Sequence, residues 1–225
     1  MIVIMEESKK IIVTRNLLEA NRLLAEKIRK KCTEEGIFLV NIVSSPGSGK
    51  TTLLERIAEK IKDENIAVIN ADIETDRDRK RIEKKGVKAI QLETKGECHL
   101  EAFVIDQVMS ELYGKGYRYV FIENIGNLIC PTEFDIGEHL RVLLLSVPEG
   151  DDKPKKYPLA FRTSHALVIS KIDLLKYLQY DIEKVEKEAL FLNPNIKIFK
   201  ISSVTGEGIE EFIIYLKNTR KRCMS

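Results

Sequence analysis

An apolar run that leads into a glycine-rich turn restricts the fold of this sequence more than any other feature. The run 37–43, "IFLVNIV", continues into "SSPGSGKTTLLERIAEKI". This stretch matches the phosphate-loop pattern G-x-x-x-x-G-K-[ST], with Ser44 in place of the first glycine. Consecutive N–H groups of such a loop, and the N-terminus of the helix that follows it, face a phosphate. The pattern therefore predicts a buried strand, a phosphate site and a helix that begins near residue 50.

The residues of this loop have distinct expected roles. The Lys50 ammonium is expected to reach the β- and γ-phosphates and to act in catalysis, and the Thr51 hydroxyl is expected to bind Mg²⁺. An ordinary turn between a strand and a helix is the alternative, but such a turn does not require an intact G-K-T. The expected nucleotide-binding residues of the loop are Gly47, Ser48, Gly49, Lys50, Thr51 and Thr52.

Apolar, strand-like runs alternate with charged, helix-like runs along most of the chain. Continuous apolar strands separated by helices predict a mostly parallel sheet that is covered on both faces. We therefore expect an α/β, doubly wound fold with helices flanking the sheet, and a single domain for a chain of 225 residues. The predicted strands are 37–43, 66–71, 87–92, 117–123, 141–147, 166–170 and 196–201, and the predicted helices begin near 50, 76, 99, 181 and 208.

The segment before the first strand is predicted to be an amphipathic helix, "TRNLLEANRLLAEKIRKKCTEEG". Asn16 and Glu19 are expected to cap its start, and Gly36 is expected to end it. We divide the chain into an N-terminal helical segment, 1–36, packed on the core, and a phosphate-loop domain, 37–225. One face of the helix carries Leu17, Asn21, Leu24 and Ile28.

A second motif distinguishes guanine from adenine. The run "VISKIDLL" predicts a buried strand that ends in S-K-I-D at 170–173. This ending is similar to the N/T-K-x-D guanine motif, with serine at its first position. The Asp173 carboxylate can accept from both the ring N–H and the exocyclic amine of guanine, whereas adenine has no such pair of donors. Lys171 can lay its stem over the base, and Ser202 and Ser203 in "ISSVTGEG" are secondary candidates for the base site.

Carboxylates at the ends of two other predicted strands are candidates for a magnesium site. Glu123 and Gly126 end the apolar strand in "VFIENIG", and Asp72 follows "IAVINA". The carboxyl ends of parallel strands meet at the crevice where ligands bind. We therefore expect Glu123 to hold Mg²⁺ through water and Gly126 to offer its N–H to the γ-phosphate, although each could instead be a simple strand-end cap.

Two cysteines and a histidine are candidates for binding a softer metal. Cys98 and His99 lie in "TKGECHLEAFVI" at a predicted loop-to-helix transition, and Cys130 lies in "ENIGNLICP" after the predicted magnesium strand. Thiolates and imidazole suit Zn²⁺ or Ni²⁺, and structural zinc takes about four ligands, so water or a second chain must complete the set. A lone cysteine is usually a small buried hydrophobe, and we interpret Cys32 and Cys223 as incidental to the site.

Charge and hydropathy argue against several classes of protein. Lys and Arg total 37 and Asp and Glu total 35, so the net charge is +2, which provides no strong field for nucleic acid or anionic lipid. The N-terminus lacks the features of a secretory signal, and no apolar run is long enough to span a bilayer. We expect a cytoplasmic protein without nucleic-acid or membrane partners. We also expect one long loop, 148–164, whose length favours a functional or partner-facing role.

The motifs, in their order, closely resemble the HypB family of hydrogenase-maturation GTPases, which belongs to the SIMIBI class of P-loop NTPases. The resemblance implies slow hydrolysis of GTP to GDP and phosphate by a GTP-dependent homodimer whose interface shares a Zn²⁺ or Ni²⁺ site. It also implies delivery of nickel to the hydrogenase large subunit together with a zinc metallochaperone. The stretches that carry the resemblance are "SSPGSGKTTLLE", "ECHLEA", "ENIGNLICP", "SVPEGDDKPKKYP", "SKIDLLKYL" and "SSVTGEGIEEF".

The resemblance also implies roles for individual residues. Asp78 and Arg81, in "DIETDRDRKRI", lie in the expected first switch segment, and either Asp72 or Asp78 orients the attacking water. The first residues, "MIVIMEESKKIIV", carry neither the cysteine-rich nor the histidine-rich nickel site of some family members. The implied site residues are Cys98, His99 and Cys130 for the transition metal, Lys50, Thr51, Asp72 and Glu123 for nucleotide and Mg²⁺, and Lys171 and Asp173 for guanine.

A mechanism and its rivals follow from this assignment. Because Cys130 lies just downstream of 123–126, a γ-phosphate sensed at Gly126 could move the segment that bears the thiol, so that metal affinity depends on the nucleotide. One rival is a urease-accessory GTPase, a relative that also handles nickel. A small-molecule P-loop kinase predicts ATP preference, and a GTP-controlled interaction module with a structural zinc predicts metal binding that ignores the nucleotide.

Overall fold

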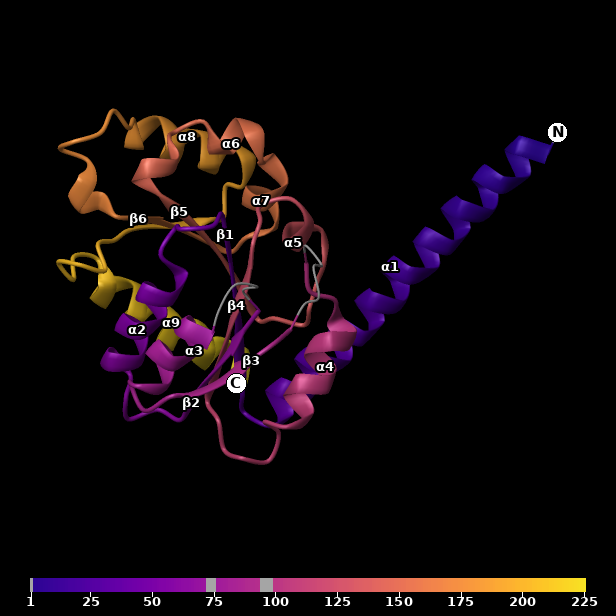
Figure 1. Ribbon diagram of the computed structural model, residues 1–225, viewed down its shortest axis with the longest axis horizontal. Helices are drawn as coiled ribbons and strands as arrows, with labels where there is room; N and C mark the ends of the chain where they lie inside the picture. Colours follow the sequence, from indigo (N-terminus) through magenta and orange to yellow (C-terminus); the bar gives the residue numbers. More distant parts are fainter. Residues whose placement is uncertain (1, 72–75, 94–98) are drawn as a thin grey trace.

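A parallel sheet of seven strands forms the centre of the computed structural model, in the order β3-β2-β4-β1-β5-β6-β7 (Figure 1). The structure describes residues 2–71, 76–93 and 99–225, and it describes side chains within 17–71, 78–93 and 99–225. Every strand pairing in the sheet is parallel. The predicted doubly wound α/β fold is therefore confirmed.

The predicted strands are all present, each within three residues of the observed ends. The strands are β1 Phe38–Ser44, β2 Ile66–Asn70, β3 Lys88–Gln91, β4 Tyr119–Gly126, β5 Leu140–Ser146, β6 Ala166–Ser170 and β7 Lys197–Lys200. The helices in the described part of the chain are α1 Ile2–Glu34, α2 Lys50–Lys60, α3 Asp76–Glu83, α4 Ala102–Ser110, α5 Cys130–Glu133, α6 Lys153–Lys156, α7 Pro158–Thr163, α8 Ile182–Leu192 and α9 Ile209–Met224. Two 3₁₀ helices, η1 Val147–Glu149 and η2 Ile172–Leu174, follow β5 and β6. The helix expected from residue 99 begins instead at Ala102.

Alternate residues of the strands bury their side chains on opposite faces of the sheet. On one face, Phe38, Val40 and Ile42 of β1 pack with α2, α3 and α9. On the other face, Leu39 packs in a cluster with α1 and α4, whereas Val43 packs in a separate cluster with α7 and α8. The fully buried side chains of such clusters each contribute about 1.5–3 kcal/mol to stability through the hydrophobic effect.

Helix α1 is longer than the sequence pattern predicts. Asn16 does not cap it, because the helix runs continuously from Ile2 through this position, and the preceding residues contain no proline or glycine that would interrupt it. Glu19, the other member of the predicted capping pair, instead forms an ion pair with Arg22 at 2.7 Å. The N-terminal part of α1 projects away from the rest of the molecule (Figure 1).

The C-terminal half of α1 is the part that packs on the sheet. Ala25, Ile28 and Cys32 are at most 1% exposed, whereas Leu17 is 67% exposed. The expected end of the helix is confirmed, because Gly36 has a φ of 71° and its N–H bonds to the carbonyl of Thr33. Together with the bond from the Ile37 N–H to the Cys32 carbonyl, this is a Schellman ending. The division at residue 36 itself remains a prediction.

The stretch 148–164 is not the long loop that its prolines and charges predicted. It contains η1, α6 and α7, and Pro148, Pro154 and Pro158 occupy their first turns. Proline is tolerated there because the first N–H groups of a helix have no partner within the helix. Within the described residues, no helix has both the length and the hydropathy needed to cross a bilayer.

Candidate functional site

The phosphate loop connects β1 to α2 at the carboxyl edge of the sheet. Gly47 and Gly49 have φ values of 72° and 100°, which residues with a side chain rarely adopt. Helix α2 begins at Lys50, so its first N–H groups are directed toward the loop. The Ser44 hydroxyl, which stands where the pattern has glycine, accepts a hydrogen bond from Lys50 Nζ at 3.0 Å. The serine thus holds the lysine across the loop.

Thr51 and Glu123 form the pair expected of a magnesium site. Thr51 Oγ1 donates to Glu123 Oε1 at 2.7 Å, and the two residues are 8% and 1% exposed. The second carboxylate oxygen of Glu123 accepts from Asn70 Nδ2 at 3.3 Å. A hydroxyl and a carboxylate beside a phosphate loop are ligands that Mg²⁺ accepts, so these residues fit the ion. Asp72, the third predicted ligand, lies outside the described residues.

Gly126 lies directly against the phosphate loop. A Cβ atom on this residue would be 3.1 Å from the backbone nitrogen of Pro46 and 3.2 Å from its Cα. Such contacts are tighter than most real Cβ contacts, so a side chain at this position would require the loop to shift by a few tenths of an ångström. The end of β4 and the phosphate loop are therefore in close contact at this point.

The S-K-I-D motif is anchored on the phosphate loop. Ser170 Oγ donates to the carbonyl of Ser48 at 2.8 Å, and Lys171 Nζ donates to the carbonyl of Gly47 at 2.7 Å. Lys171 is also the one described residue other than glycine with a positive φ, 58°. Serine at the first motif position thus keeps a bond to the loop. This strained and doubly bonded geometry fixes the S-K-I-D motif relative to the phosphate loop.

Asp173 is positioned by the loop after β7. Its Oδ1 accepts a hydrogen bond from the Ser202 hydroxyl at 2.5 Å. The same hydroxyl accepts from the Thr205 N–H at 3.1 Å. The carbonyl of Ser203 is held by Nε of Arg56, on α2, at 2.7 Å. Of the two serines predicted as secondary candidates, Ser202 therefore contacts the aspartate, whereas Ser203 joins the loop to Arg56, a residue that no sequence pattern indicated.

Asp78 and Arg81 connect α3 to α2. Arg81 Nη1 bonds to Asp78 Oδ1 at 3.1 Å, and its other nitrogens bond to both carboxylate oxygens of Glu55. Arg81 Nη2 also donates to the Thr52 hydroxyl at 3.2 Å. The carboxylate bonds, with Glu55 first, raise the pKa of Arg81. The network joins the expected first switch segment to the helix that follows the phosphate loop.

Glu149 is a residue of this region that the sequence analysis missed. Its Oε1 accepts from the Ser48 hydroxyl of the phosphate loop at 2.8 Å, and also from the Ser146 N–H and hydroxyl, each at 2.8 Å. The bonds to Ser146 form a capping box around η1. The spacing S-x-x-E at 146–149 was the available signal, but it predicts only a helix start and not a contact with the phosphate loop.

The structure describes two of the three predicted ligands of the transition metal. Cys130 is the first residue of α5 and is partly exposed as a free thiol. The His99 ring stacks on Phe134, which follows α5, with centroids 4.1 Å apart and an angle of 18° between the planes. Cys98 lies outside the described residues, among which no three His, Cys, Asp or Glu side chains gather to hold a metal. The segments of His99 and Cys130 therefore meet, but they do not form a complete site within the described part.

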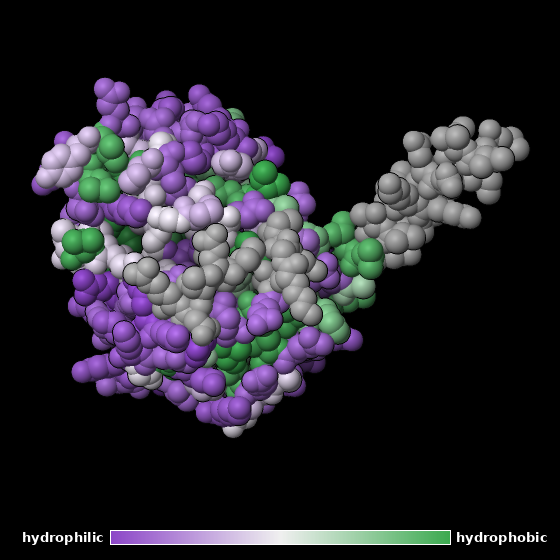
Figure 2. All heavy atoms as spheres, viewed as in Figure 1, coloured by the Kyte–Doolittle hydropathy of each residue, from purple (hydrophilic) through white to green (hydrophobic). Residues whose placement is uncertain are grey.

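An apolar groove lies beside His99. It is lined by residues of α1, the start of α4 and Phe134, and its volume is about 380 Å³. Hydrophobic side chains gather on this side of the molecule, where α1 leaves the body (Figure 2). Phe103, which is 59% exposed, is among them. The groove and the His99 ring share Phe134, so a partner that fills the groove would touch the predicted metal segment.

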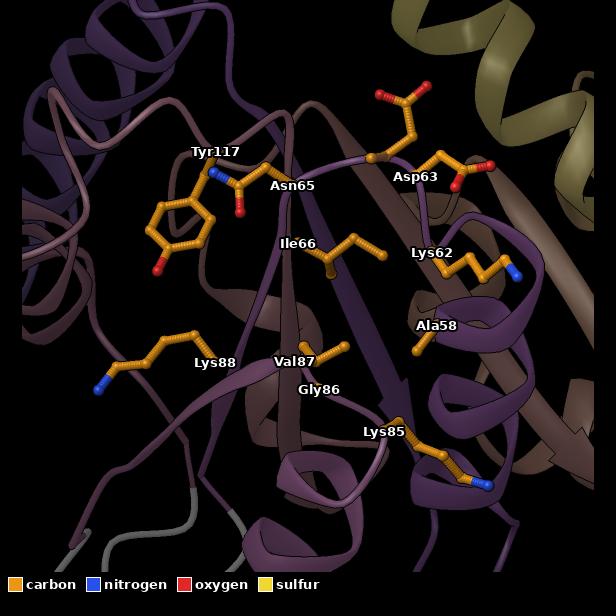
Figure 3. A pocket seen from close by; sticks show the side chains of 11 residues that line it. Ala58, Lys62, Asp63, Asn65, Ile66, Lys85, Gly86, Val87, Lys88 and Tyr117 are labelled. Atoms are coloured by element: carbon orange, nitrogen blue, oxygen red, sulfur yellow. The ribbon is translucent and has the colours of Figure 1, made fainter.

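A second hollow of about 380 Å³ lies at the opposite, amino-terminal edge of the sheet, near the starts of β2 and β3. The side chains of Lys62, Lys85 and Lys88 line it, and Figure 3 shows Lys62 and Lys85 extending to one side and Lys88 to the other. Lys85 is paired with Glu59 at 2.6 Å. These lysines therefore do not converge on a ligand, in contrast to the groups at the phosphate loop.

The fold and the loop define the class of this protein, which is a nucleotide-binding P-loop protein of the SIMIBI type. Residues 38–200 match the family described as "CobW/HypB/UreG, nucleotide-binding domain", and the chain belongs to this family. The resemblance inferred from the motifs is thus confirmed at the level of the family.

Individual relatives are similar over most of their length. The "Hydrogenase/urease maturation factor HypB" of Helicobacter hepaticus is 39% identical over 216 residues, which cover 94% of this chain and 89% of that protein. The crystal structure of the hydrogenase maturation factor HypB from Archaeoglobus fulgidus superimposes with a TM-score of 0.85 at 39% identity, covering 90% of this chain and 100% of that one. HypB from Helicobacter pylori in complex with nickel gives a TM-score of 0.84 at 38% identity, covering 90% and 96%.

Proposed function

We propose that this protein is a GTPase that couples GTP-dependent dimerisation to nickel binding and thereby helps to insert nickel into the hydrogenase large subunit. The observation that carries the proposal is the path of the chain after β4. Glu123 and Gly126 lie against the phosphate loop, and Cys130 follows four residues later at the start of α5. One short segment of the chain, 123–130, therefore carries both the residues that contact the phosphate loop and the thiol.

The nucleotide half of the proposal assigns GTP as the substrate. Lys50 neutralises the β- and γ-phosphates, and Thr51 with Glu123 holds Mg²⁺, which supplies charge compensation at the phosphates when it is bound. Asp173 accepts from the two guanine donors, and its bond from Ser202 keeps one oxygen in place. Either Asp72 or Asp78 orients the attacking water. We expect intrinsic hydrolysis to be slow unless an arginine from a second chain reaches the phosphates, since Arg81 is already bonded to Asp78 and Glu55.

The metal half assigns Cys98, His99 and Cys130 as ligands of nickel, the cargo, with zinc as a competing ion. Imidazole and thiolate are suitable ligands for both ions. Three ligands leave the set open, so a second chain or water completes it. The nickel complex of the H. pylori relative supports the choice of ion.

A homodimer with the metal at its interface accounts for the incomplete site and the apolar groove. The groove beside His99 exposes Leu17 and Phe103, and apolar surface of this kind marks interaction sites. A zinc metallochaperone and the hydrogenase large subunit precursor are the further partners. The printed name of the H. hepaticus relative includes urease, so a urease-type acceptor is the second candidate for the destination of the nickel.

Nickel titration of the purified protein tests the proposal. The protein is loaded with GDP or with a non-hydrolysable GTP analogue, and the mass of each sample is measured by light scattering. We expect tighter nickel binding and a doubled mass with the GTP analogue, and we expect Cys98→Ala to abolish the tightening while Cys32→Ala leaves it intact. Metal binding that is identical in the two nucleotide states would identify a structural zinc site and contradict nickel delivery.

A further inference from the structure

A row of buried polar side chains crosses one face of the sheet between the two halves of the proposed mechanism. Its members are Asn124 of β4, Asn41 of β1, Glu138, and Arg141 of β5, which we call the polar row. All four are at most 6% exposed. They lie on the face of the sheet that carries two separate apolar clusters, and none of them belongs to either cluster. Burial of so many polar groups is costly unless each one is hydrogen-bonded.

One end of the polar row lies on β4, the strand that carries the expected magnesium ligand Glu123. Asn124 follows Glu123 directly, at a point where β4 has one residue more than β1 between the pairs Ile42 with Glu123 and Ser44 with Gly126. Such bulges redirect a strand next to functional sites. Asn124 Oδ1 accepts from the Ile125 N–H at 2.8 Å and so stabilises the bulge.

The middle of the polar row is continuous. Asn124 Nδ2 donates to Asn41 Oδ1 at 3.0 Å, and Asn41 Nδ2 donates to Glu138 Oε1 at 3.2 Å. The same oxygen accepts from Arg141 Nε at 2.6 Å. Burial alone would raise the pKa of Glu138, but the charge of Arg141 and the hydrogen bonds hold it well below the ordinary value. Each side chain of the row is thus hydrogen-bonded to the next.

At its other end the polar row holds the segment that carries the thiol. Arg141 Nη1 donates to the carbonyl of Thr132 at 3.0 Å, and Nη2 donates to the carbonyl of Phe134 at 2.7 Å. Thr132 is two residues after Cys130, and the Phe134 ring stacks on His99. A single guanidinium therefore holds the backbone of the segment that begins with Cys130 and carries Phe134, on whose ring His99 stacks.

We propose that the polar row transmits the state of the nucleotide site to the metal segment 130–134, with Asn124 and Arg141 as positioning residues. When the end of β4 moves against the phosphate loop, Asn124 shifts Asn41, the paired Glu138 and Arg141 follow, and the carbonyls of Thr132 and Phe134 move with the guanidinium. A purely stabilising role needs no such row, since apolar side chains of similar volume often serve a buried site equally well. The inference rests on the proposed function, because it assigns the route of the coupling that this function requires.

Two variants of the full chain test the inference. Asn124→Ala removes the bonds to Asn41 and to the Ile125 N–H but leaves the pair of Glu138 and Arg141 intact. Arg141→Lys keeps the charge beside Glu138, yet a lysine cannot reproduce the planar fork to two carbonyls. Thr132→Val is the matched control, because it alters the same segment without removing the carbonyl that Arg141 holds. Circular dichroism and thermal melting show whether each variant is folded, and if Arg141→Lys is not folded, Asn124→Ala decides alone.

Two readouts separate this inference from the proposed function. Amide hydrogen exchange across 127–136, without metal, is compared between GDP and a non-hydrolysable GTP analogue, and nickel affinity is measured in both states. We expect the exchange to differ in the wild type and in Thr132→Val and to be equal in Asn124→Ala and Arg141→Lys. The ratio of nickel affinities, about tenfold or more in the wild type, should fall to within about twofold in both variants.

Three other results would contradict the inference, the proposed function or both. If the folded variants keep the wild-type difference in exchange and the wild-type ratio of affinities, the row is only structural and the inference is overturned. If the wild type shows a difference in exchange that the variants lose, but nickel affinity ignores the nucleotide, the proposed function fails while the route through the row stands. If the wild type shows no difference in either readout, both are overturned.

Discussion

Thr51 and Glu123 lie within hydrogen-bond distance, 2.7 Å, although 72 residues separate them in the chain. The contact joins the first turn of α2 to the end of β4. Both groups are buried, and the second oxygen of the carboxylate is also bonded, to Asn70. This arrangement holds the two residues in place for the proposed binding of Mg²⁺.

Glu123→Gln is expected to weaken Mg²⁺ binding and GTP hydrolysis without unfolding the protein. The amide oxygen can still accept from Thr51, but the negative charge that attracts the ion is lost. We expect the hydrolysis rate to fall by about tenfold or more, since charge at the phosphates is the main contribution to catalysis. Hydrolysis is measured over a range of Mg²⁺ concentrations, and GDP affinity without the ion serves as the control. An unchanged dependence on Mg²⁺ would remove Glu123 from the metal site.

Asp173→Asn is expected to exchange guanine for xanthine specificity. Xanthine carries an oxygen where guanine carries its exocyclic amine, so an asparagine amide can donate to it where an aspartate is repelled. We expect GTP affinity to fall by about tenfold or more and xanthosine triphosphate affinity to rise, because an unmatched buried polar pair costs about 1–3 kcal/mol. Both affinities are measured by calorimetry, with Lys50 intact. Preference for ATP in either protein would favour the kinase alternative.

Gly137→Ala is expected to loosen α1 from the segment that follows α5. Gly137 has a φ of 89°, and a Cβ there would lie 2.7 Å from Ile28 and 2.8 Å from the Ala25 carbonyl. Backbone strain of about 1–2 kcal/mol and overpacking of about 1–3 kcal/mol should together reduce the free energy of unfolding. Gly86→Ala is the matched control, because its φ is 77° but no atom lies within 4 Å of the added Cβ. Equal losses in denaturant unfolding would show that the contact with α1 is not tight.

Stability is expected to fall in acid because of His139. Burial, and next the charge of Arg29, lower the pKa of this imidazole to about 4, and its Nδ1 accepts from the Leu39 N–H at 3.1 Å. The ordinary pKa of histidine is about 6.5, so the unfolded chain binds more protons between about pH 6.5 and 4. The contribution is therefore complete above about pH 6.5 and is lost as the pH falls through this window.

Unfolding in denaturant at several pH values between 7 and 4 measures this effect. His139→Asn keeps an acceptor for the Leu39 N–H but cannot become charged, so its free energy of unfolding should depend less steeply on pH than that of the wild type. His165, whose pKa burial also lowers, remains in both proteins as an internal reference. Parallel pH curves for the two proteins would contradict the assignment to His139.

The elements that the sequence predicted correctly share a local cause. A continuous apolar run produces a buried strand whether or not its partners are known, so β1 and β6 were found to within one residue. The loop from Gly47 to Thr51 and the S-K-I-D motif carry their chemistry in adjacent residues. The start of α1 was predicted wrongly for the same reason. Asn16 has the local pattern of a helix cap, and nothing in the residues next to it indicates that the helix has already begun.

Contacts between distant residues could not be predicted in this way. The bond from Ser202 to Asp173 and the stack of His99 on Phe134 join loops that only the folded sheet brings together. Glu149 shows how far a local pattern can predict a contact. Its spacing to Ser146 predicts a helix start, whereas its bond to Ser48 depends on the position of the end of β5 beside β1.

The sequence by itself determined the order of the strands and of the longer helices, the phosphate loop and the residue types of both candidate sites, because these depend on short-range patterns of hydropathy and backbone freedom. The tertiary structure alone decided which of those residues meet. Asn41, Asn124, Glu138 and Arg141 come from three strands and a connecting segment, and nothing in their own neighbourhoods marks them as partners. They become one hydrogen-bonded row only because the parallel register places their side chains on the same face of the sheet, where all four are buried and each polar group must be satisfied by another.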